Sequence, residues 1–394
     1  MNVTLIGAGC GAGTLTRDAA EAVESADLVI GAGRLLKEQD GAFETVERVR
    51  PGEILEILQR KKPENACVLL SGDTGFYSGT AKLLGLLQEN GIGARVIPGI
   101  SSLQAFAAKL GRAWQNWRLC SAHGVSCDPV YEVMQGKPVF FLTSGKEGPA
   151  ALCAALTEAG LGGLSVTVGE RFGDPEERLE TGTAQAFSKR SFDVLNVMLA
   201  EAAPVYPARV HGIPDDEFLR DEAPMTKQEV RAAALSKLAL APDDVCWDIG
   251  AGTGSVSVEM ALQTRSVWAV EMKPAALETA RRNREKFCAW NLHLIEGTAP
   301  AALETLPVPD AVFVGGSAGH LKEILEKVLE KAPAARICVA AVSAETLGRA
   351  LDALSALGCA AEVTQISAAR SRAVGGLHMM TAQNPVWLIT GGRK

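Results

Sequence analysis

The chain has 394 residues, of which 47% are hydrophobic and 22% are charged. This composition is that of a packed globular protein with two or three domains, and it excludes intrinsic disorder. The net charge of −7 and the lack of a lysine- and arginine-rich run argue against a nucleic-acid-binding surface. Since no run of about 18 apolar residues occurs, we expect no membrane-spanning helix.

Nine cysteines are scattered along the chain without any Cys-x-x-Cys pair. Such cysteines are typically free, buried thiols in a reducing compartment. The chain starts on an apolar strand and shows no signal-peptide pattern, so we expect a cytoplasmic protein. Its five histidines have no metal-ligand spacing, and no metal is expected.

Strands and helices alternate in the first part of the chain, which predicts an α/β fold with a mainly parallel sheet. A helix is expected over 16–26, with Thr16 as its N-cap. A second block of the same kind is expected from about 118 to 200. Apolar runs predict strands over 3–6, 28–30, 66–70, 95–97, 139–142, 165–168 and 194–199.

Prolines and a polar run interrupt this alternation between 201 and 226. The prolines are Pro204, Pro207, Pro214 and Pro224. Because proline restricts helix and strand alike, we place a linker at 201–210. The alternation then restarts with a helix over 229–238. The prediction is therefore two α/β domains, 1–200 and 211–394.

A glycine-rich loop follows the predicted strand 245–249 and opens a helix. Its residues are Asp248, Gly250, Ala251, Gly252, Thr253 and Gly254. Such a loop lets the backbone approach a ligand at a helix N-terminus. The spacing Gly-x-Gly-x-Gly with a preceding Asp favours S-adenosylmethionine, whose ammonium a carboxylate can help to bind. A nicotinamide cofactor and a purely structural turn stay open as alternatives.

An acidic residue ends the next predicted strand. Glu271 lies 23 residues after Asp248. A carboxylate in this place can accept hydrogen bonds from both ribose hydroxyls of an adenosine. We expect Glu271 to be a partly exposed ribose ligand.

The C-terminal half resembles the Rossmann-type (class I) methyltransferases, and within them the decarboxylating precorrin methyltransferases of cobalamin synthesis. The matching stretches are Gly-Ile-Pro-Asp-Asp-Glu-Phe at 212–218, Pro-Met-Thr-Lys-Gln-Glu-Val-Arg at 224–231, Gly-Thr-Ala-Pro at 297–300, Val-Gly-Gly-Ser-Ala-Gly at 314–319 and Asn-Pro-Val at 384–386. The resemblance implies that Thr226 and Ala299 contact the cofactor. Thr298 stands where the family often has Asp, so the adenine contact is expected from the backbone and Ala299.

Three further loops follow strands in the N-terminal half, at 7–13, 71–77 and 98–102. The carboxyl ends of parallel strands meet at one sheet edge, where open α/β folds bind ligands. Together the loops resemble those of the tetrapyrrole methylases (class III), over about 1–200. The resemblance implies a second S-adenosylmethionine site formed by Gly9, Gly72, Asp73, Thr74, Ser101 and Ser102. Thr74 and Cys10 stand where these proteins more often have proline.

The two resemblances imply a two-site methyltransferase that acts on a small-molecule precorrin. The N-terminal half would methylate carbon 5, and the C-terminal half would methylate carbon 15 and release CO₂ from the ring C acetate. His123 is a candidate acid or base, since 121–124 match the carbon-5 subgroup. Arg231, Arg370 and Arg372 are candidates for holding substrate carboxylates. A homo-oligomer without nucleic-acid or membrane partners is expected.

Two other functions are weighed. Both superfamilies include RNA methyltransferases, but the Asn-Pro-Pro-aromatic tetrad of amino-directed enzymes is replaced by Gly315-Gly316-Ser317. A non-enzymatic S-adenosylmethionine sensor would need only one complete site. Both alternatives are less favoured than a precorrin methyltransferase.

Overall fold

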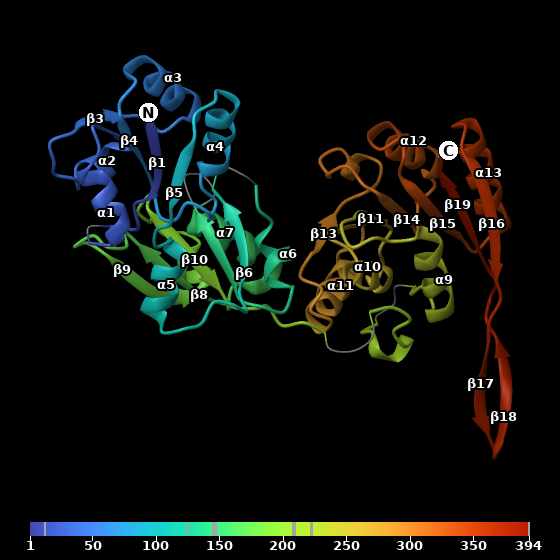
Figure 1. Cartoon of the computed structure of the whole chain (residues 1–394). Coiled ribbons are helices and arrows are strands. Elements are labelled where there is room, and N and C mark those ends of the chain that lie inside the picture. The colour runs from blue at the N-terminus through green and yellow to red at the C-terminus, as the bar shows by residue number, and fades with distance from the viewer. Residues whose placement is uncertain (12, 124–125, 144–147, 207–209, 221–223, 393–394) are drawn as a thin grey trace. The chain divides into compact units, whose positions relative to one another are not determined.

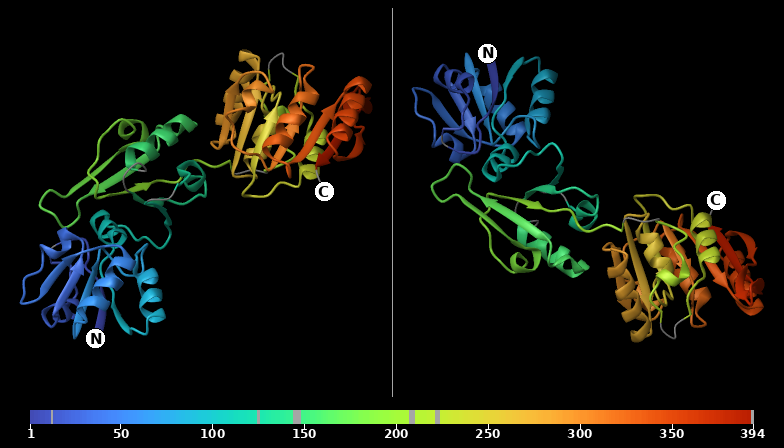
Figure 2. Two further views of the ribbon diagram at one scale, coloured as in Figure 1. Left: turned by 90° about the horizontal axis from the view of Figure 1, so that it is seen from above. Right: turned by 90° about the horizontal axis from the view of Figure 1, so that it is seen from below.

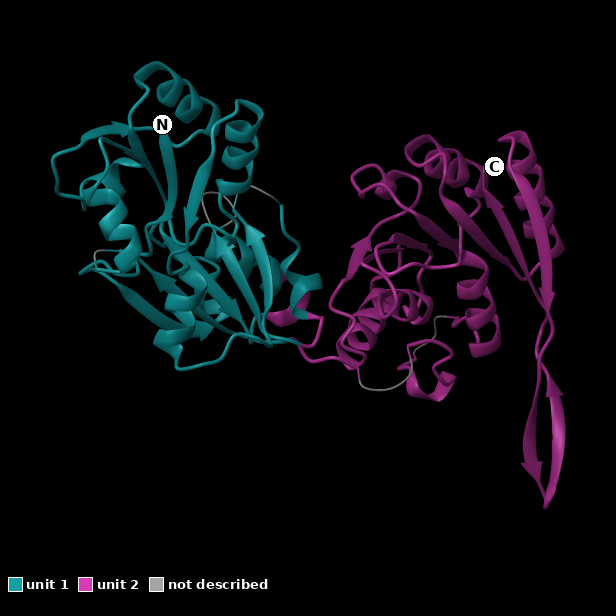
Figure 3. Cartoon of the chain, viewed as in Figure 1, with its two compact units in different colours: residues 1–133, 137–157, 162–202 teal, residues 134–136, 158–161, 203–394 magenta. Residues whose placement is uncertain are grey.

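The computed structural model describes residues 1–11, 13–123, 126–143, 148–206, 210–220 and 224–392. Ala12, Gly124 and residues 207–209 of the predicted linker lie outside the described residues. The chain forms two compact units (Figure 3). Unit 1 contains residues 1–133, 137–157 and 162–202, and unit 2 contains 134–136, 158–161 and 203–394.

Unit 1 begins with a five-stranded, fully parallel sheet of order β3-β2-β4-β1-β5 (Figure 1). Its strands are β1 (Asn2–Gly7), β2 (Leu28–Gly31), β3 (Glu44–Glu47), β4 (Asn65–Leu70) and β5 (Ala94–Ile97). Its helices are α1 (Arg17–Glu24), α2 (Gly33–Leu36), α3 (Pro51–Lys61), α4 (Thr80–Glu89) and α5 (Ser102–Leu110). The Thr16 side chain accepts a hydrogen bond from the Ala19 N–H and caps α1, as predicted.

The second sheet of unit 1 is mainly antiparallel, with the order β6-β7-β10-β8-β9. The strands are β6 (Arg118–Ala122), β7 (Val139–Thr143), β8 (Ser165–Glu170), β9 (Arg178–Thr183) and β10 (Asn196–Ala200). The helices are α6 (Pro129–Val133), α7 (Pro149–Leu156) with a π turn (Thr157–Leu161), and α8 (Ala184–Phe187). The expectation of a second block like the first is therefore wrong. The short connection from β8 to β9 carries no helix, and a parallel crossover needs a dozen or more residues.

Unit 2 is built on a seven-stranded sheet of order β13-β12-β11-β14-β15-β19-β16. Its strands are β11 (Val245–Ile249), β12 (Ser266–Glu271), β13 (Leu292–Glu296), β14 (Ala311–Val314), β15 (Arg336–Ala341), β16 (Ala360–Ile366) and β19 (Val386–Gly392). The first five strands are parallel in the doubly wound order, and β19 is antiparallel to both its neighbours. This confirms the predicted fold class.

Helices cover both faces of the unit 2 sheet (Figure 2). They are α9 (Gln228–Leu238), α10 (Ser255–Ala261), α11 (Pro274–Lys286), α12 (Leu321–Lys331) and α13 (Ala344–Ala356), with a 3₁₀ turn at Ala301–Leu303. Trp247 and Ile249 pack with α12 and α13, whereas Cys246, which precedes Trp247, packs with α9 and α10. This alternation follows from the period of two in a strand, and it leaves Asp248 at the carboxyl end of β11.

The proline-rich segment that follows unit 1 belongs largely to unit 2. Ile213 and Phe218 are buried in the core beside α9 and α10, on either side of a 3₁₀ turn at Asp215–Glu217. The described residues 210–220 are thus part of the folded unit.

A two-stranded hairpin, here called the arm, connects β16 to β19. It consists of β17 (Ala369–Val374) and β18 (Leu377–Ala382), joined by Gly375 and Gly376 with φ of 55° and 84°. Positive φ at both turn residues suits a tight hairpin turn. Nearly all arm residues are exposed, and the arm projects from unit 2 (Figure 1). The sequence analysis did not predict it.

The described part of the chain has no helix long and apolar enough to cross a membrane. All nine cysteines are free, and five of them are buried.

We predict that 1–200 and 211–394 fold separately, because each half has its own hydrophobic clusters and its own sheets. Each half should give a soluble product with a cooperative thermal transition when it is expressed alone. Circular dichroism on both fragments checks this. Aggregation or lack of structure in both would show that these boundaries are wrong.

Candidate active sites

A cavity of about 970 Å³ lies at the carboxyl ends of β11, β12 and β14 in unit 2. Seven residues predicted to bind the cofactor line it, namely Thr226, Asp248, Gly250, Ala251, Gly252, Glu271 and Ala299. The structure thus brings together residues that are up to 73 positions apart (299 − 226) in the sequence. The cavity is large enough for a cofactor and part of a second ligand.

The glycine loop after β11 packs directly against the loop after β14. A Cβ atom at Gly250 would lie 2.6 Å from the Gly316 carbonyl oxygen, and Gly250 has a φ of 74°. Both facts exclude a side chain at Gly250. The close approach therefore requires a glycine at position 250, whereas a Cβ atom at Gly316 would lie 3.8 Å from the Cα of Gly250, an ordinary contact.

Two predicted ligands of the same loop lie behind it and do not line the cavity. Gly254 is the N-cap of α10, and a Cβ atom there would lie 2.9 Å from the Cβ of Ala280. The Thr253 side chain is buried, and its hydroxyl has no partner among the described residues. Their direct role in binding stays a prediction, and their visible role is to shape the loop.

Glu271 ends β12 beneath the glycine loop. Its Oε2 accepts the Gly252 N–H at 2.9 Å, and its Oε1 accepts the Lys273 N–H at 2.9 Å. The residue is only 8% exposed, so the expectation of partial exposure was wrong, because the loop closes over it. Each carboxylate oxygen has a second lone pair for a ligand hydroxyl.

Asp248 provides a buried carboxylate oxygen without a partner. Ser257 Oγ donates to Oδ2, while Oδ1 has no hydrogen bond among the described residues. Burial raises the pKa of Asp248 to about 7, and the nearby Glu271 carboxylate adds to the increase. A buried acceptor of this kind is costly unless a ligand donor pairs with it. It fits the ammonium group of an amino-acid tail.

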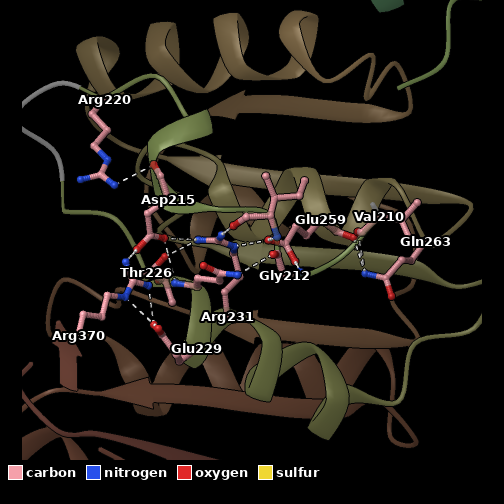
Figure 4. Close-up of polar contacts among 12 residues, drawn as sticks. Val210, Gly212, Asp215, Arg220, Thr226, Glu229, Arg231, Glu259, Gln263 and Arg370 are labelled. Atoms are coloured by element: carbon pink, nitrogen blue, oxygen red, sulfur yellow. Dashed lines mark hydrogen bonds and ion pairs between the residues drawn. The ribbon is translucent and has the colours of Figure 1, made fainter. Parts of the chain in front are cut away.

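Arg231 does not reach the cavity, so its predicted role as a substrate ligand is wrong. Its side chain is 0% exposed and forms an ion pair with Glu259 at 2.5 Å (Figure 4). The guanidinium also donates to the carbonyl oxygens of Thr226 at 2.7 Å and Ile213 at 2.5 Å. Position 231 faces inward from α9, which is why its charge is neutralised inside the protein.

Arg370 is likewise occupied, which corrects its predicted role. It makes two bonds to Glu229, at 2.8 and 2.6 Å, and an ion pair with Asp215 at 2.8 Å. Arg372 lies two residues further along β17, is exposed and has no ion pair among the described residues. Only Arg372 remains available as a predicted anion ligand, and it does not line the cavity.

The cavity contains two cations that the sequence analysis missed. Lys227 and Lys273 line it, and neither forms an ion pair within the described part of the chain. Lys227 lies in the matched stretch 224–231, and Lys273 follows Glu271 by two positions. Because each lysine stands next to or near a predicted cofactor ligand in the sequence, both could have been predicted to line the site.

In unit 1, three loops meet at the carboxyl ends of β1, β4 and β5. Gly9 and Gly72 exchange backbone hydrogen bonds of 3.0 and 2.8 Å. Asp73 accepts the Gly99 N–H at 3.1 Å and the Gly75 N–H at 2.8 Å. The predicted residues of the first two loops are thus adjacent, and Thr74 of the second loop is half-buried.

The third loop leads into α5. Ser101 caps this helix through a capping box with Gln104, and Ser102 is the first helical residue. The hydroxyl of Ser101 is therefore already engaged. In the first loop, Thr14 Oγ1 accepts the N–H groups of Cys10 and Gly11, which holds the loop in the absence of a proline.

His123 follows β6 and is exposed, and its backbone N–H donates to Ser121 Oγ at 3.4 Å. Tyr77 of the second loop donates to the Leu119 carbonyl on β6 at 3.2 Å. The strand that precedes His123 is therefore attached to the glycine-loop region. A catalytic role of His123 stays a prediction.

Comparison with known proteins agrees with this arrangement. Residues 2–187 match the tetrapyrrole (corrin/porphyrin) methylases, and residues 216–391 match the precorrin methyltransferase domain. The fold and its glycine loops thus define an S-adenosylmethionine-dependent C-methyltransferase. A precorrin-6Y C(5,15)-methyltransferase [decarboxylating] from Sinorhizobium is 33% identical over 86% of this chain and 81% of its own length. The chain belongs to this family of decarboxylating precorrin methyltransferases.

Other relatives match the C-terminal half. A probable cobalt-precorrin-6B C(15)-methyltransferase (decarboxylating) from Pyrobaculum calidifontis is 45% identical over 47% of this chain and 97% of its own. The crystal structure of a precorrin-6Y C5,15-methyltransferase from Geobacter metallireducens is 42% identical over 48% of this chain and 98% of its own, with a TM-score of 0.45.

We predict that cofactor binding in unit 2 weakens as the pH falls below about 7, the pKa of Asp248. Only the carboxylate attracts an ammonium, and its fraction falls about tenfold between pH 8 and pH 6 for such a pKa. Calorimetric titration with S-adenosylhomocysteine at both pH values checks this. Asp248→Asn should bind weakly and without the pH dependence, and an unchanged profile in that variant would contradict the assignment.

Proposed function

We propose that this chain methylates a precorrin macrocycle at carbons 5 and 15 and removes CO₂ from its ring C acetate, in the cytoplasmic synthesis of cobalamin. The observation that supports this most is the Sinorhizobium relative, which matches across both halves of the chain. The cavity in unit 2 supplies a place for the carbon-15 reaction. We assign carbon 5 to unit 1.

We propose Asp248, Glu271 and Thr226 as the main cofactor ligands of unit 2, because all three line the cavity. The unpartnered Asp248 oxygen would bind the ammonium, and Glu271 would accept the ribose hydroxyls. S-adenosylmethionine, when bound, supplies an electrophilic methyl group. Since the enamine-like carbon of a precorrin is already nucleophilic, the residues mainly have to align donor and acceptor, which can contribute about 7–11 kcal/mol.

Decarboxylation requires that the acetate be oriented, not activated by a strong base. When the bond to CO₂ breaks, its electron pair passes into the conjugated, protonated ring. The protein has to hold the other substrate carboxylates, and Lys227 and Lys273 are placed to do so at the cavity. Arg372 on the arm remains an additional candidate.

We propose a second cofactor site in unit 1, formed by Gly9, Gly72, Asp73, Thr74, Ser101 and Ser102. The backbone contacts between the first two loops and the bond from Gly99 to Asp73 support it. A Cβ atom at Gly11 would lie 2.7 Å from the Cα of Gly173, so the first loop also touches the second sheet's turn. This places the loops beside a junction of two subdomains, where ligands commonly bind.

The alternatives are less well supported. An RNA methyltransferase would need an anion-binding surface, whereas the chain has a net charge of −7. A sensor would not need the two free lysines at the cavity.

Incubation with a precorrin-6 substrate and S-adenosylmethionine tests the proposal. The product should gain two methyl groups and lose CO₂, as measured by mass spectrometry. Glu271→Ala should give a product with one added methyl and an intact acetate, because only the unit 2 site is disabled. Loss of CO₂ with two methyl additions in this variant at low cofactor concentration would show that Glu271 is not the ribose ligand.

Calorimetric titration with S-adenosylhomocysteine measures cofactor binding in the same two proteins, the unaltered chain and Glu271→Ala. The unaltered chain should bind two molecules, and Glu271→Ala should retain one tight site. Charge-assisted bonds are worth about 1.5–3 kcal/mol each, so affinity at the other site should fall roughly ten- to several-hundred-fold. Because Glu271 also fixes Gly252, a lower melting temperature is expected as well.

We also propose that the chain forms a homo-oligomer through the arm. Leu377 and Met380 in the arm are 71% and 65% exposed, and an exposed apolar ribbon is unfavourable in water. A second copy of the arm would cover it. Light scattering should show an oligomer that Met380→Glu dissociates, while Lys322→Glu on the exposed face of α12 should not. A monomeric unaltered chain would contradict the proposal.

A further inference from the structure

A cluster of charges, buried at its centre and partly exposed at one end, lies behind one wall of the cavity in unit 2. This wall is formed by Pro224, Met225, Thr226 and Lys227, which precede α9 and have no regular secondary structure. The cluster consists of Arg231, Glu259, Asp215, Glu229 and Arg370 (Figure 4). None of these five residues lines the cavity.

Arg231 is the centre of the cluster. It reaches Glu259 on α10 and Asp215 in the segment before the wall. Its guanidinium also donates to the Thr226 carbonyl of the wall at 2.7 Å and lies 4.7 Å from the ring centroid of Phe218. One side chain thus fixes three separate pieces of backbone relative to each other.

The carboxylates extend these contacts. Glu259 accepts the N–H groups of Gly212 at 2.6 Å and Ile213 at 3.0 Å. Asp215 accepts the N–H of Gln228, the first residue of α9, at 2.9 Å. Residues 212 and 213 and the start of α9 are therefore both fixed by hydrogen bonds, and the wall lies between them in the sequence.

Arg370 connects this cluster to the root of the arm. It binds Glu229 in the first turn of α9 with two bonds, and it pairs with Asp215 at 2.8 Å. Planar two-bond contacts between Arg and a carboxylate fix geometry as well as adding energy. Residues 229 and 370 are 141 positions apart, so this contact links the arm to the first turn of α9, directly after the wall.

Stability alone does not account for such a cluster. A buried ion pair commonly adds little compared with apolar residues of similar volume, because burying the charges costs solvation energy. Such a cluster does, however, fix the positions of the backbone segments that it connects, here including the wall. The wall touches the glycine loop, since a Cβ at Gly252 would lie 3.1 Å from the Pro224 carbonyl oxygen. A displaced wall would therefore change the cavity where the cofactor is proposed to bind.

We infer that Arg231 and Arg370 are positioning residues that hold the Thr226 wall in place for cofactor binding in unit 2. The inference rests on the proposed cofactor site. Arg231 acts on the wall directly, and Arg370 acts through Glu229 and Asp215. Arg370 thereby also ties the root of the arm to the cofactor cavity.

Arg370→Ala tests this in the full-length chain, because the side chain is 39% exposed and can be removed without an internal void. Titration with S-adenosylhomocysteine should show roughly two- to thirtyfold weaker binding at the unit 2 site, the range typical of residues that act through a network. The unit 1 site should be unchanged in the same titration. The KM for S-adenosylmethionine in the carbon-15 reaction should rise more than kcat falls.

Arg281→Ala is the matched control, because Arg281 on α11 is also partly exposed, makes two bonds to Glu278 at 2.9 and 2.7 Å, and does not line the cavity. It should leave the affinity of the unit 2 site unchanged. Glu229→Gln should resemble Arg370→Ala, and the double variant should be no worse than the worse single variant, because both remove one contact. Arg370→Lys should bind more tightly than Arg370→Ala, because it keeps the charge. Likewise, Arg231→Lys should bind more tightly than Arg231→Met, provided that Arg231→Met folds.

Equal affinities for Arg370→Ala and Arg281→Ala would overturn the inference, even if Arg370→Ala melted at a lower temperature. An unaltered chain that binds S-adenosylhomocysteine only in unit 1 would overturn the proposed function instead. The two failures are therefore distinguishable in one set of titrations.

Discussion

Both halves of this chain depend on backbones that touch without side chains between them. In unit 1, a Cβ atom at Gly7 would lie 2.5 Å from the Gly99 nitrogen, and in unit 2 one at Gly250 would lie 2.6 Å from the Gly316 oxygen. Each contact joins loops that leave adjacent parallel strands. Such close approach leaves N–H groups and short loops at the sheet edge, where a ligand can bind them.

The charges of unit 2 serve two distinct purposes. One group is neutralised inside the protein and shapes it, as Arg231 and Glu259 do. The other group lines the cavity without internal partners, as Lys227 does in the described structure. The distinction follows from the local backbone, since Lys227 is the extended N-cap residue before α9 whereas Arg231 lies within the helix and is buried. For a substrate that carries several carboxylates, the second group matters for recognition.

The sequence was sufficient to locate the glycine loop at the cavity of unit 2, because a strand, a glycine loop and an acidic strand end occur at a defined spacing. Asp248 and Glu271 could be found in this way, and both line the cavity. The arginines could not be assigned, because no pattern shows whether a guanidinium points inward, and Arg231 is paired with residues 16 and 28 positions away. The arm was missed since its residues are exposed on both faces, and the alternation that marks a half-buried strand is absent.

The order of strands in unit 2 has a consequence for synthesis on the ribosome. β19 is the last strand in this chain, yet it lies inside the sheet between β15 and β16. Until β19 leaves the ribosome, β15 and β16 each have an edge of unpaired backbone N–H and C=O groups, because β19 is the strand that pairs with both of them. Unit 1, in contrast, has all its strands by Ala200. The nascent chain can therefore complete its first unit while the second is still being translated, and the second can close only after translation passes β19.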